Sequence, residues 1–358
     1  MGRVIFAIAL ASMFACGGHV VSGAPVDAAV DEAEAGPTAD TSPTSLDDGP
    51  DSVDTFFAVD GLPDPAGWER VDPDAPGGSR PSLFGSIVGR ADDDVWVGDT
   101  NGEVEYYARQ SLWSWDGHRF AEMGAAGGGL GYPGLCATRA AYWSLDYFQH
   151  FLTRGTSSGV VIVDSAPGTA PNAITCTSSA VWSLGGDGHI RRHVEGVDGW
   201  SLVDDGLAAL AGGWSALDAV ADDDVWLVSD AGAIARWNGA GWTGVTAPTL
   251  PNPMWISGSS SSDVWLTTRD AVALHWDGSA FHEVSLPRGA TAVFAVSSKE
   301  AWAVGRGDLQ RWDGMRWADQ ALPRELHADS PGRDYLQAVW ASPSYVWVVA
   351  HHVWRKPR

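Results

Sequence analysis

A short apolar segment with a tryptophan at its centre recurs along the chain, each time after a polar turn. The pattern is clearest in ADDDVWLVS from Ala221, SSSDVWLTT from Ser260 and SSKEAWAVG from Ser297. Seven tryptophans mark the copies, at intervals of 47, 39, 44, 39, 37 and 45 residues: Trp96, Trp143, Trp182, Trp226, Trp265, Trp302 and Trp347. A period of about 40 residues indicates a repeat architecture, in which neighbouring units bury each other's apolar faces.

Each copy divides into four short strands. The first precedes the polar turn and the second carries the marker tryptophan. The third ends in Trp-Asp-Gly or Trp-Asn-Gly, at Trp115, Trp237, Trp276 and Trp312, and the fourth holds an aromatic soon afterwards, at Phe120, Trp242, Phe281 and Trp317. Asp-Gly and Asn-Gly between apolar runs are strong hairpin signals. The runs are too short for helices, and we expect no amphipathic helix.

Four antiparallel strands repeated seven times predict an all-β fold, a seven-bladed β-propeller. The seventh copy ends without a fourth strand. An unassigned segment near the start, Gly67–Val71, resembles the fourth strand of the copy at Gly241–Val245. We therefore expect this N-terminal strand to close the last blade, which removes the open edges of the ring. The tryptophans are then expected to fill the wedges between blades.

The N-terminus predicts export. Arg3 precedes an apolar run from Val4 to Phe14, which is too short to span a bilayer but suits a signal peptide over residues 1–15. The run ends at Ala15-Cys16-Gly17, which resembles the lipobox of bacterial lipoproteins. That resemblance implies lipidation of Cys16 and an outer-membrane, cell-surface or periplasmic location. An ordinary cleaved signal peptide with an incidental cysteine is the alternative.

Residues 16–60 differ in composition from the rest of the chain. They are rich in Ala, Pro, Asp and Ser, and ten acidic residues lie between Asp27 and Asp60 without any Lys or Arg. Low hydrophobicity and charge of one sign predict a disordered tether. The propeller is assigned to residues 61–358.

The charge of the chain argues against two classes of binding partner. Its formal net charge is −23. Such an acidic protein repels nucleic acid and anionic lipid headgroups. Neither is expected as a partner.

Two cysteines remain in the predicted propeller. Cys136 lies seven residues before its marker tryptophan and Cys176 lies six before the next marker. An offset of one residue points the two side chains to opposite faces of their sheets. Adjacent blades meet by opposite faces, so the two thiols can face each other. A disulfide and a pair of buried free thiols both remain open.

Residues 60–358 resemble the Trp-rich propeller repeats of uncharacterised secreted bacterial lipoproteins, which are distantly similar to sialidase-type and galactose-oxidase-type propellers. The Trp-Asp of this chain is followed by Gly and opens a hairpin, unlike the Trp-Asp dipeptide of WD40 repeats. The Ser-x-Asp-x-Gly-x-x-Trp box of sialidases is missing as well. The resemblance therefore implies a fold and leaves the function open.

Binding residues are expected on the variable loops at one rim, because loops on a rigid scaffold usually carry function. Aromatic, arginine and aspartate side chains of these loops suit a glycan, a peptide or a protein. The candidates around the central mouth are Tyr106, Tyr107, Arg109, Tyr132, Trp214, Arg333, Asp334 and Tyr335. These side chains can also simply fill the mouth of the ring.

Signals for catalysis and cofactors are weak. Sugar hydrolysis needs two carboxylates roughly 5–10 Å apart, and the sequence pairs none. Asp92–Asp94 and Asp222–Asp224 could supply oxygen ligands to calcium, but such residues also satisfy backbone groups of their own turns. His189 and His193 share a strand face and His351 adjoins His352, without a third metal ligand. We expect no cofactor.

Three functions remain open. The first is a non-enzymatic, cell-envelope binding module with a glycan, peptide or protein partner. The second is a carbohydrate-active enzyme, a glycoside hydrolase or lyase. The third is a structural subunit of an envelope assembly, which would expose an apolar patch on an outer strand. Oligomeric state is left unassigned.

Overall fold

A computed structural model of the chain describes residues 67–73, 83–100, 109–128, 134–146, 151–163, 171–210, 212–249, 253–323, 326 and 336–358. The predicted signal peptide, the lipidation residue Cys16 and the tether 16–60 lie outside these residues. Seven four-stranded antiparallel sheets form the described part. The predicted seven-bladed propeller is confirmed.

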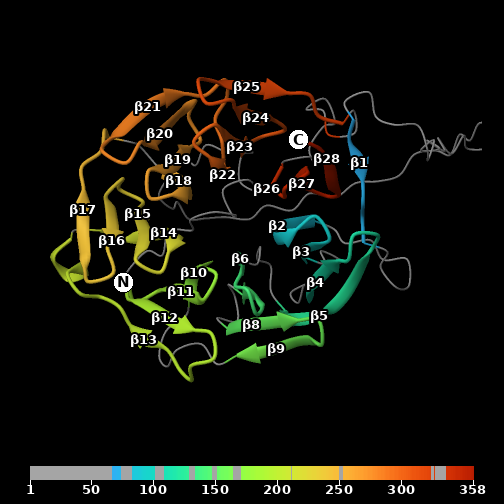
Figure 1. Ribbon diagram of the computed structural model, residues 1–358, viewed down its shortest axis with the longest axis horizontal. Coiled ribbons are helices and arrows are strands. Elements are labelled where there is room, and N and C mark those ends of the chain that lie inside the picture. The colour runs from blue at the N-terminus through green and yellow to red at the C-terminus, as the bar shows by residue number, and fades with distance from the viewer. Residues whose placement is uncertain are drawn as a thin grey trace, which may run out of the picture. The chain divides into compact units, whose positions relative to one another are not determined.

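The strands follow one another from the axis to the rim within each blade (Figure 1). Blades 1 to 3 comprise β2 (Leu83–Ala91), β3 (Asp94–Thr100), β4 (Arg109–Trp115) and β5 (Phe120–Gly128); β6 (Gly134–Ala137), β7 (Tyr142–Asp146), β8 (Phe151–Thr156) and β9 (Gly159–Val163); and β10 (Pro171–Cys176), β11 (Ala180–Gly185), β12 (Ile190–Val194) and β13 (Ser201–Leu202).

Blades 4 to 6 repeat the same order. They comprise β14 (Trp214–Ala221), β15 (Asp224–Ser229), β16 (Ile234–Trp237) and β17 (Trp242–Val245); β18 (Pro253–Ser260), β19 (Asp263–Thr268), β20 (Val272–Trp276) and β21 (Phe281–Ser285); and β22 (Ala292–Ser297), β23 (Glu300–Val304), β24 (Leu309–Trp312) and β25 (Trp317–Gln320). The innermost strands of adjacent blades contact each other all the way round, including β26 with β2, so the ring is closed.

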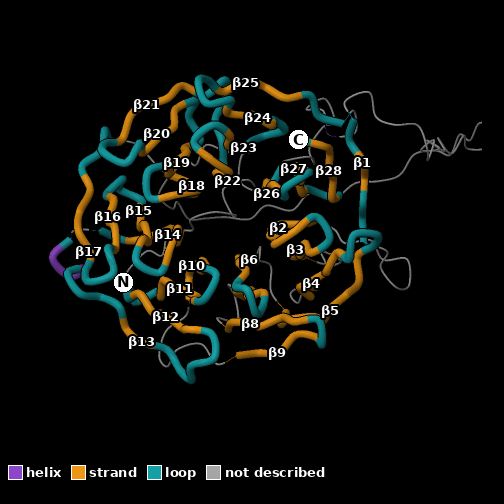
Figure 2. Tube along the Cα trace, in the orientation of Figure 1, coloured by secondary structure: helices purple, strands orange, loops and turns teal. Residues whose placement is uncertain are grey.

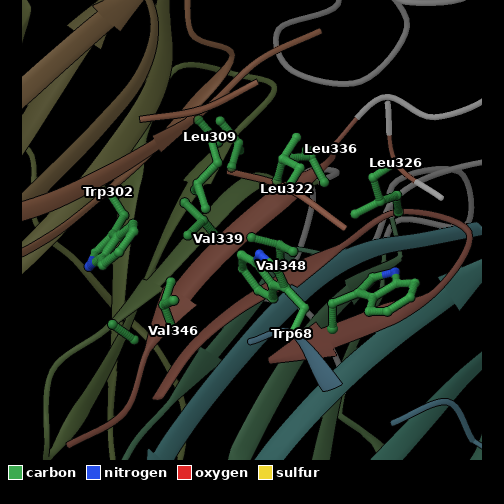
Figure 3. Packing of buried hydrophobic residues seen from close by; sticks show 14 residues of the cluster. Trp68, Trp302, Leu309, Leu322, Leu326, Leu336, Val339, Val346 and Val348 are labelled. Atoms are coloured by element: carbon green, nitrogen blue, oxygen red, sulfur yellow. The ribbon is translucent and has the colours of Figure 1, made fainter. Parts of the chain in front are cut away.

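Blade 7 contains β26 (Ala338–Ala341), β27 (Tyr345–Val349), β28 (Val353–Pro357) and, at its rim, β1 (Glu69–Arg70) from the other end of the described chain. β1 pairs antiparallel with β28, as predicted. Trp68 is buried in the same cluster as Val348 and Leu326 (Figure 3). Its indole Nε1 donates to the carbonyl of Ala321 at 2.8 Å. This packing ties the N-terminal strand to the last two blades.

The marker tryptophans are the structural centre of the repeat. All seven lie on the second strands and are at most 2 % exposed. An arginine on the third strand lies over the marker ring in blades 3, 4, 6 and 7, with Arg236 4.7 Å from the centre of Trp226. His275 stacks on Trp265 at 4.0 Å in blade 5. The prediction that these tryptophans serve packing is confirmed.

Helical structure in the described chain is limited to 3-10 turns, at Leu207–Ala209 (Figure 2) and at Leu326. This agrees with the expectation from the sequence. Within the same residues, no helix has the length and apolar character needed to cross a bilayer.

Candidate functional site

A central cavity of about 450 Å³ lies on the propeller axis. Its wall is built mainly from the innermost strands of all seven blades, β2, β6, β10, β14, β18, β22 and β26, whose side chains are often small. Ligand sites in proteins commonly have volumes of roughly 300–1,000 Å³. The cavity is therefore large enough for a side chain or a small molecule.

One residue of each innermost strand pairs directly with the marker tryptophan on the second strand. We call these seven residues the inner belt: Val88, Cys136, Thr175, Asp218, Ser257, Phe294 and Trp340. All seven line the cavity. The next residue along each strand is small in every blade: Gly89, Ala137, Cys176, Ala219, Gly258, Ala295 and Ala341. A small residue at this place lets the neighbouring blade approach closely.

The belt is polar or covalent from blade 2 to blade 5. Cys136 forms a disulfide with Cys176 of blade 3, with 5.4 Å between the Cα atoms. Of the two alternatives left open by the sequence, the structure has the bond. Thr175 Oγ1 accepts from the backbone N–H of Ala219 at 3.2 Å, and Ser257 Oγ accepts from that of Ala295 at 3.1 Å. Each link joins one blade to the next.

Asp218 makes the corresponding links on both sides. Thr175 Oγ1 donates to its Oδ1 at 3.2 Å, and the backbone N–H of Gly258 donates to its Oδ2 at 2.7 Å. Burial raises the pKa of the Asp218 carboxyl to about 6, although these hydrogen bonds favour the charged form. The negative charge of Asp224 raises this pKa further. The Asp218 carboxyl therefore stays protonated to a higher pH than an ordinary aspartate does.

The remaining part of the belt is apolar. The Phe294 ring of blade 6 lies 6.4 Å from the Trp340 ring of blade 7. The Trp340 ring in turn lies against Gly89 of blade 1, where a Cβ atom would come within 2.5 Å of Cη2. Trp255, two residues before the belt in blade 5, adds a third ring to the cavity wall and is partly buried. Aromatic surface thus covers one side of the cavity.

Charge is scarce in the cavity wall. Among its described lining residues, only Asp218 and Arg90 are charged. Arg90 Nε donates to Asp94 Oδ2 at 2.7 Å and Nη1 donates to the carbonyl of Arg139 at 2.9 Å. Its guanidinium also lies over the Tyr142 ring at 4.5 Å. Arg90 is thus engaged by blades 1 and 2, whereas Asp218 has no salt-bridge partner in the described chain.

Most binding residues predicted from the sequence fall outside the described residues: Tyr106, Tyr107, Tyr132, Arg333, Asp334 and Tyr335. Arg109 begins β4, but its side chain is not among those described. Trp214 begins β14 and packs, partly buried, against the apolar cluster that includes Trp182 and Leu217. It does not belong to the cavity wall. The sequence interpretation missed Asp218, Trp255, Phe294 and Trp340, although all four lie on first strands and three of them pair with a marker tryptophan.

The acidic turns serve the blade interfaces. Asp92 Oδ1 accepts from the backbone N–H of Ser344 in blade 7, and Asp222 accepts from Thr177 and Ser179 of blade 3. Our expectation that these aspartates satisfy their own turns was wrong here, because the bonds run between blades. It holds for the third-to-fourth turns, where Asp116 accepts from His118 and Arg119. No group of three or more His, Cys, Asp or Glu suited to a metal ion occurs in the described chain, which includes both acidic turns.

Three of the histidines considered above as metal ligands each contact a different residue. His189 lies within hydrogen-bonding distance of Asp204, and His193 Nδ1 lies 2.9 Å from the carbonyl of Gly199. His352 Nδ1 lies 2.7 Å from Asp72 Oδ2, which helps hold the closing segment to blade 7. These contacts explain the residues as structural.

Comparison with known proteins agrees with the fold. No protein-family model matches the chain, and no curated protein matches it in sequence. A structure of YCF48 bound to D1 peptide is similar with a TM-score of 0.59 and 13 % identity, covering 84 % of this chain and 97 % of that one. YCF48 from Cyanidioschyzon merolae gives 0.58 and 15 %, covering 82 % and 99 %.

The WD40 repeats of RRP9 are similar with a TM-score of 0.61 and 9 % identity, covering 82 % of this chain and 98 % of that one. Such low identities establish a common fold and nothing further. The relation to sialidase-type and galactose-oxidase-type propellers stays a prediction. The chain is a Trp-rich seven-bladed β-propeller, and its fold is similar to that of these solved propellers.

Proposed function

We propose that this chain is a non-enzymatic binding module that receives a segment of a peptide or protein partner in its central cavity. The observation that carries the proposal is the composition of the cavity wall, with aromatic rings on one side and one hydrogen-bonded carboxylate on the other. Aromatic surface together with a few placed polar groups is typical of ligand sites. The YCF48 structure bound to D1 peptide supports the proposal, because a propeller of similar architecture holds a peptide.

The cavity favours binding over glycoside hydrolysis. A glycosidase generally uses two carboxyl groups on either side of the scissile bond. The described residues of the cavity wall supply one, Asp218. The wall therefore suits recognition better than this chemistry.

The proposal includes a place in the cell. We infer from residues 1–16 that the chain is exported and anchored through a lipidated Cys16, with residues 16–60 as a spacer. Mass spectrometry of the N-terminus of the purified protein tests this. A diacylated or triacylated peptide beginning at Cys16 is expected, and Cys16→Ala should release the protein from the membrane fraction. An unmodified N-terminus elsewhere would overturn the anchor.

Peptide and glycan arrays probed with the purified full-length protein test the proposed function. Binding to a set of peptides is expected, and Phe294→Ala should weaken it by more than a matched change outside the cavity, Met315→Ala. Met315 is 88 % exposed on a turn of blade 6. Binding to glycans alone would replace the peptide partner by a sugar. Binding to neither array would overturn the proposed function.

One observation favours a second candidate, a structural subunit of an envelope assembly. The rim strand β9 has the sequence GVVIV, and Val161 and Ile162 are 58 % and 65 % exposed. An uncharged, apolar edge strand is open to pairing with another chain. Light scattering of the wild type and of Ile162→Lys tests this candidate. A single monomeric species for both proteins would exclude self-assembly through β9.

A further inference from the structure

We propose that the cavity recognises a primary ammonium group, which pairs with the Asp218 carboxylate while its hydrocarbon stem packs on Trp255 and Phe294. This inference rests on the proposed function and specifies its ligand chemistry. A lysine side chain of a partner peptide and a free small amine both present such a group. The experiment below separates these two sources.

Geometry leaves room at the carboxylate. Each oxygen of Asp218 receives a hydrogen bond from a neighbouring blade, from Thr175 on one side and Gly258 on the other. An ionised carboxylate has about four acceptor sites, so these bonds do not exhaust its capacity. The residue as a whole is partly buried and belongs to the cavity wall. A donor that enters the cavity can therefore reach it.

The charge of Asp218 exceeds what its structural role requires. Thr175 and Ser257 occupy equivalent belt positions and link their blades with neutral hydroxyl groups. A carboxylate at the same place has the added cost of desolvating a charge. Groups with a perturbed pKa inside a cavity are candidates for function. An incoming cation would offset that cost, which a purely structural role leaves unexplained.

Electrostatics of the surroundings favour a cation. The strands packed against Asp218 present Thr175, the backbone of Gly258 and a second carboxylate, Asp224. Arg236 donates hydrogen bonds of 2.7 and 3.0 Å to Asp224, so its guanidinium is paired with Asp224 rather than with Asp218. The net charge of −23 also attracts cations to the protein as a whole.

Aromatic surface completes the site. Trp255 and Phe294 are partly buried in adjacent blades 5 and 6, next to blade 4, which carries Asp218. Burying a hydrocarbon stem against these rings is favourable, because it removes apolar surface from water. Aromatic faces also attract cations directly. A compact ligand with a short apolar stem and an ammonium end matches this wall.

The test uses 2-phenylethylamine and its neutral analogue 2-phenylethanol as probes, with binding to the full-length protein measured by calorimetry. We expect the amine to bind more tightly than the alcohol. Asp218→Asn should weaken binding of the amine by about 10-fold to 100-fold, as expected for the loss of a charged hydrogen bond. Asp230→Asn is the matched control, because Asp230 is exposed on a turn of the same blade. It should leave the affinity unchanged. Wild-type affinity should fall as the pH drops below about 6, where Asp218 takes up a proton.

The outcomes separate this inference from the proposed function. The proposed ammonium site would be overturned if the amine and the alcohol bound with equal affinity, or if Asp218→Asn left the affinity for the amine unchanged. Peptide binding on the array that ignores lysine and survives Asp218→Asn would do the same while leaving the proposed function intact. Lysine-dependent peptide binding identifies a side chain as the source, and binding of the amine alone identifies a small molecule. If Asp218→Asn does not fold, Asp218→Ser and the pH dependence of wild-type binding test the same ammonium site.

Discussion

The two sides of the inner belt hold adjacent blades together by different means. From blade 2 to blade 5 the links are a disulfide and directed hydrogen bonds, through Cys136, Thr175, Asp218 and Ser257. In blades 6, 7 and 1 they are ring packing around Trp340. The apolar side includes blade 7, where the two ends of the propeller meet.

This difference has a physical reason. Blade 7 is closed without a covalent bond, by β1 pairing on β28 and by Trp68 packing into the core. Large aromatic side chains bury the most surface per residue, so they suit the seam of the ring. The polar side lies away from the seam and can accept a group such as Asp218, which adds little to stability. The carboxylate of the proposed site and the closing seam therefore lie on different blades.

The largest effect is expected for Trp340→Ala on the apolar side. The substitution removes a buried ring that contacts blades 6 and 1, and such changes cost about 3–5 kcal/mol. Urea unfolding followed by tryptophan fluorescence measures the loss. The exposed control Met315→Ala should change stability by less than about 0.5 kcal/mol. A loss at position 340 no larger than in the control would refute the role of aromatic packing at the seam.

Removal of the disulfide by Cys136→Ala and Cys176→Ala should cost somewhat less. The bond closes a loop with a sequence separation of 40 residues, and disulfides of this kind typically contribute about 2–4 kcal/mol. Unfolding of the variant and of the wild type, each with and without reductant, measures it. Reductant should lower the wild type to the level of the variant and leave the variant unchanged. Equal stabilities in the absence of reductant would contradict a stabilising link.

The repeat itself could be predicted from the sequence, because a marker tryptophan recurs in every blade at an almost fixed interval. The closing strand was predicted correctly for a similar reason, since the segment at Trp68 resembles other fourth strands. The arrangement of Cys136 opposite Cys176 followed from their offset of one residue, although the sequence could not decide between thiols and a bond.

The site was harder to predict, because the first strand carries a bulge just before its turn in some blades and not in others. Asp218 lies eight residues before its marker and Thr175 only seven, owing to a bulge between Ala219 and Ala221. Aligned by distance from the marker alone, the belt residues fall out of register. Their contacts also join blades about 40 residues apart, and no local pattern records such neighbours. The aromatic side of the cavity was missed because every tryptophan could be explained by wedge packing.

Asp218→Asn should change stability in the opposite direction from the first two variants. The folded protein holds the proton with a pKa of about 6, whereas an unfolded aspartate has about 3.9. The unfolded chain therefore releases its proton first as the pH rises, and wild-type stability falls between pH 4 and 6. Each pH unit in that range corresponds to about 1.4 kcal/mol.

The asparagine variant lacks this titration. We expect it to equal the wild type near pH 4 and to exceed it by up to about 2 kcal/mol at pH 7. Asparagine removes the buried charge, and its amide oxygen can still accept one of the two hydrogen bonds. Urea unfolding at a series of pH values measures the difference. An asparagine variant that is less stable at pH 7 would mean that the hydrogen bonds to the charged carboxylate outweigh its desolvation.

Ser257→Ala is expected to have the smallest effect, and it tests how much one polar link contributes. The variant leaves the buried N–H of Ala295 without its acceptor at 3.1 Å, which typically costs about 1–2 kcal/mol. Hydrogen exchange at the Ala295 amide should become faster, whereas Ser285→Ala, at an exposed position of β21, should change neither quantity. A loss as large as that of Trp340→Ala would show that the two sides of the belt differ in chemistry but not in strength. The expected smaller loss would instead show that residues on the polar side can be substituted with little loss of stability, as a binding site on these blades requires.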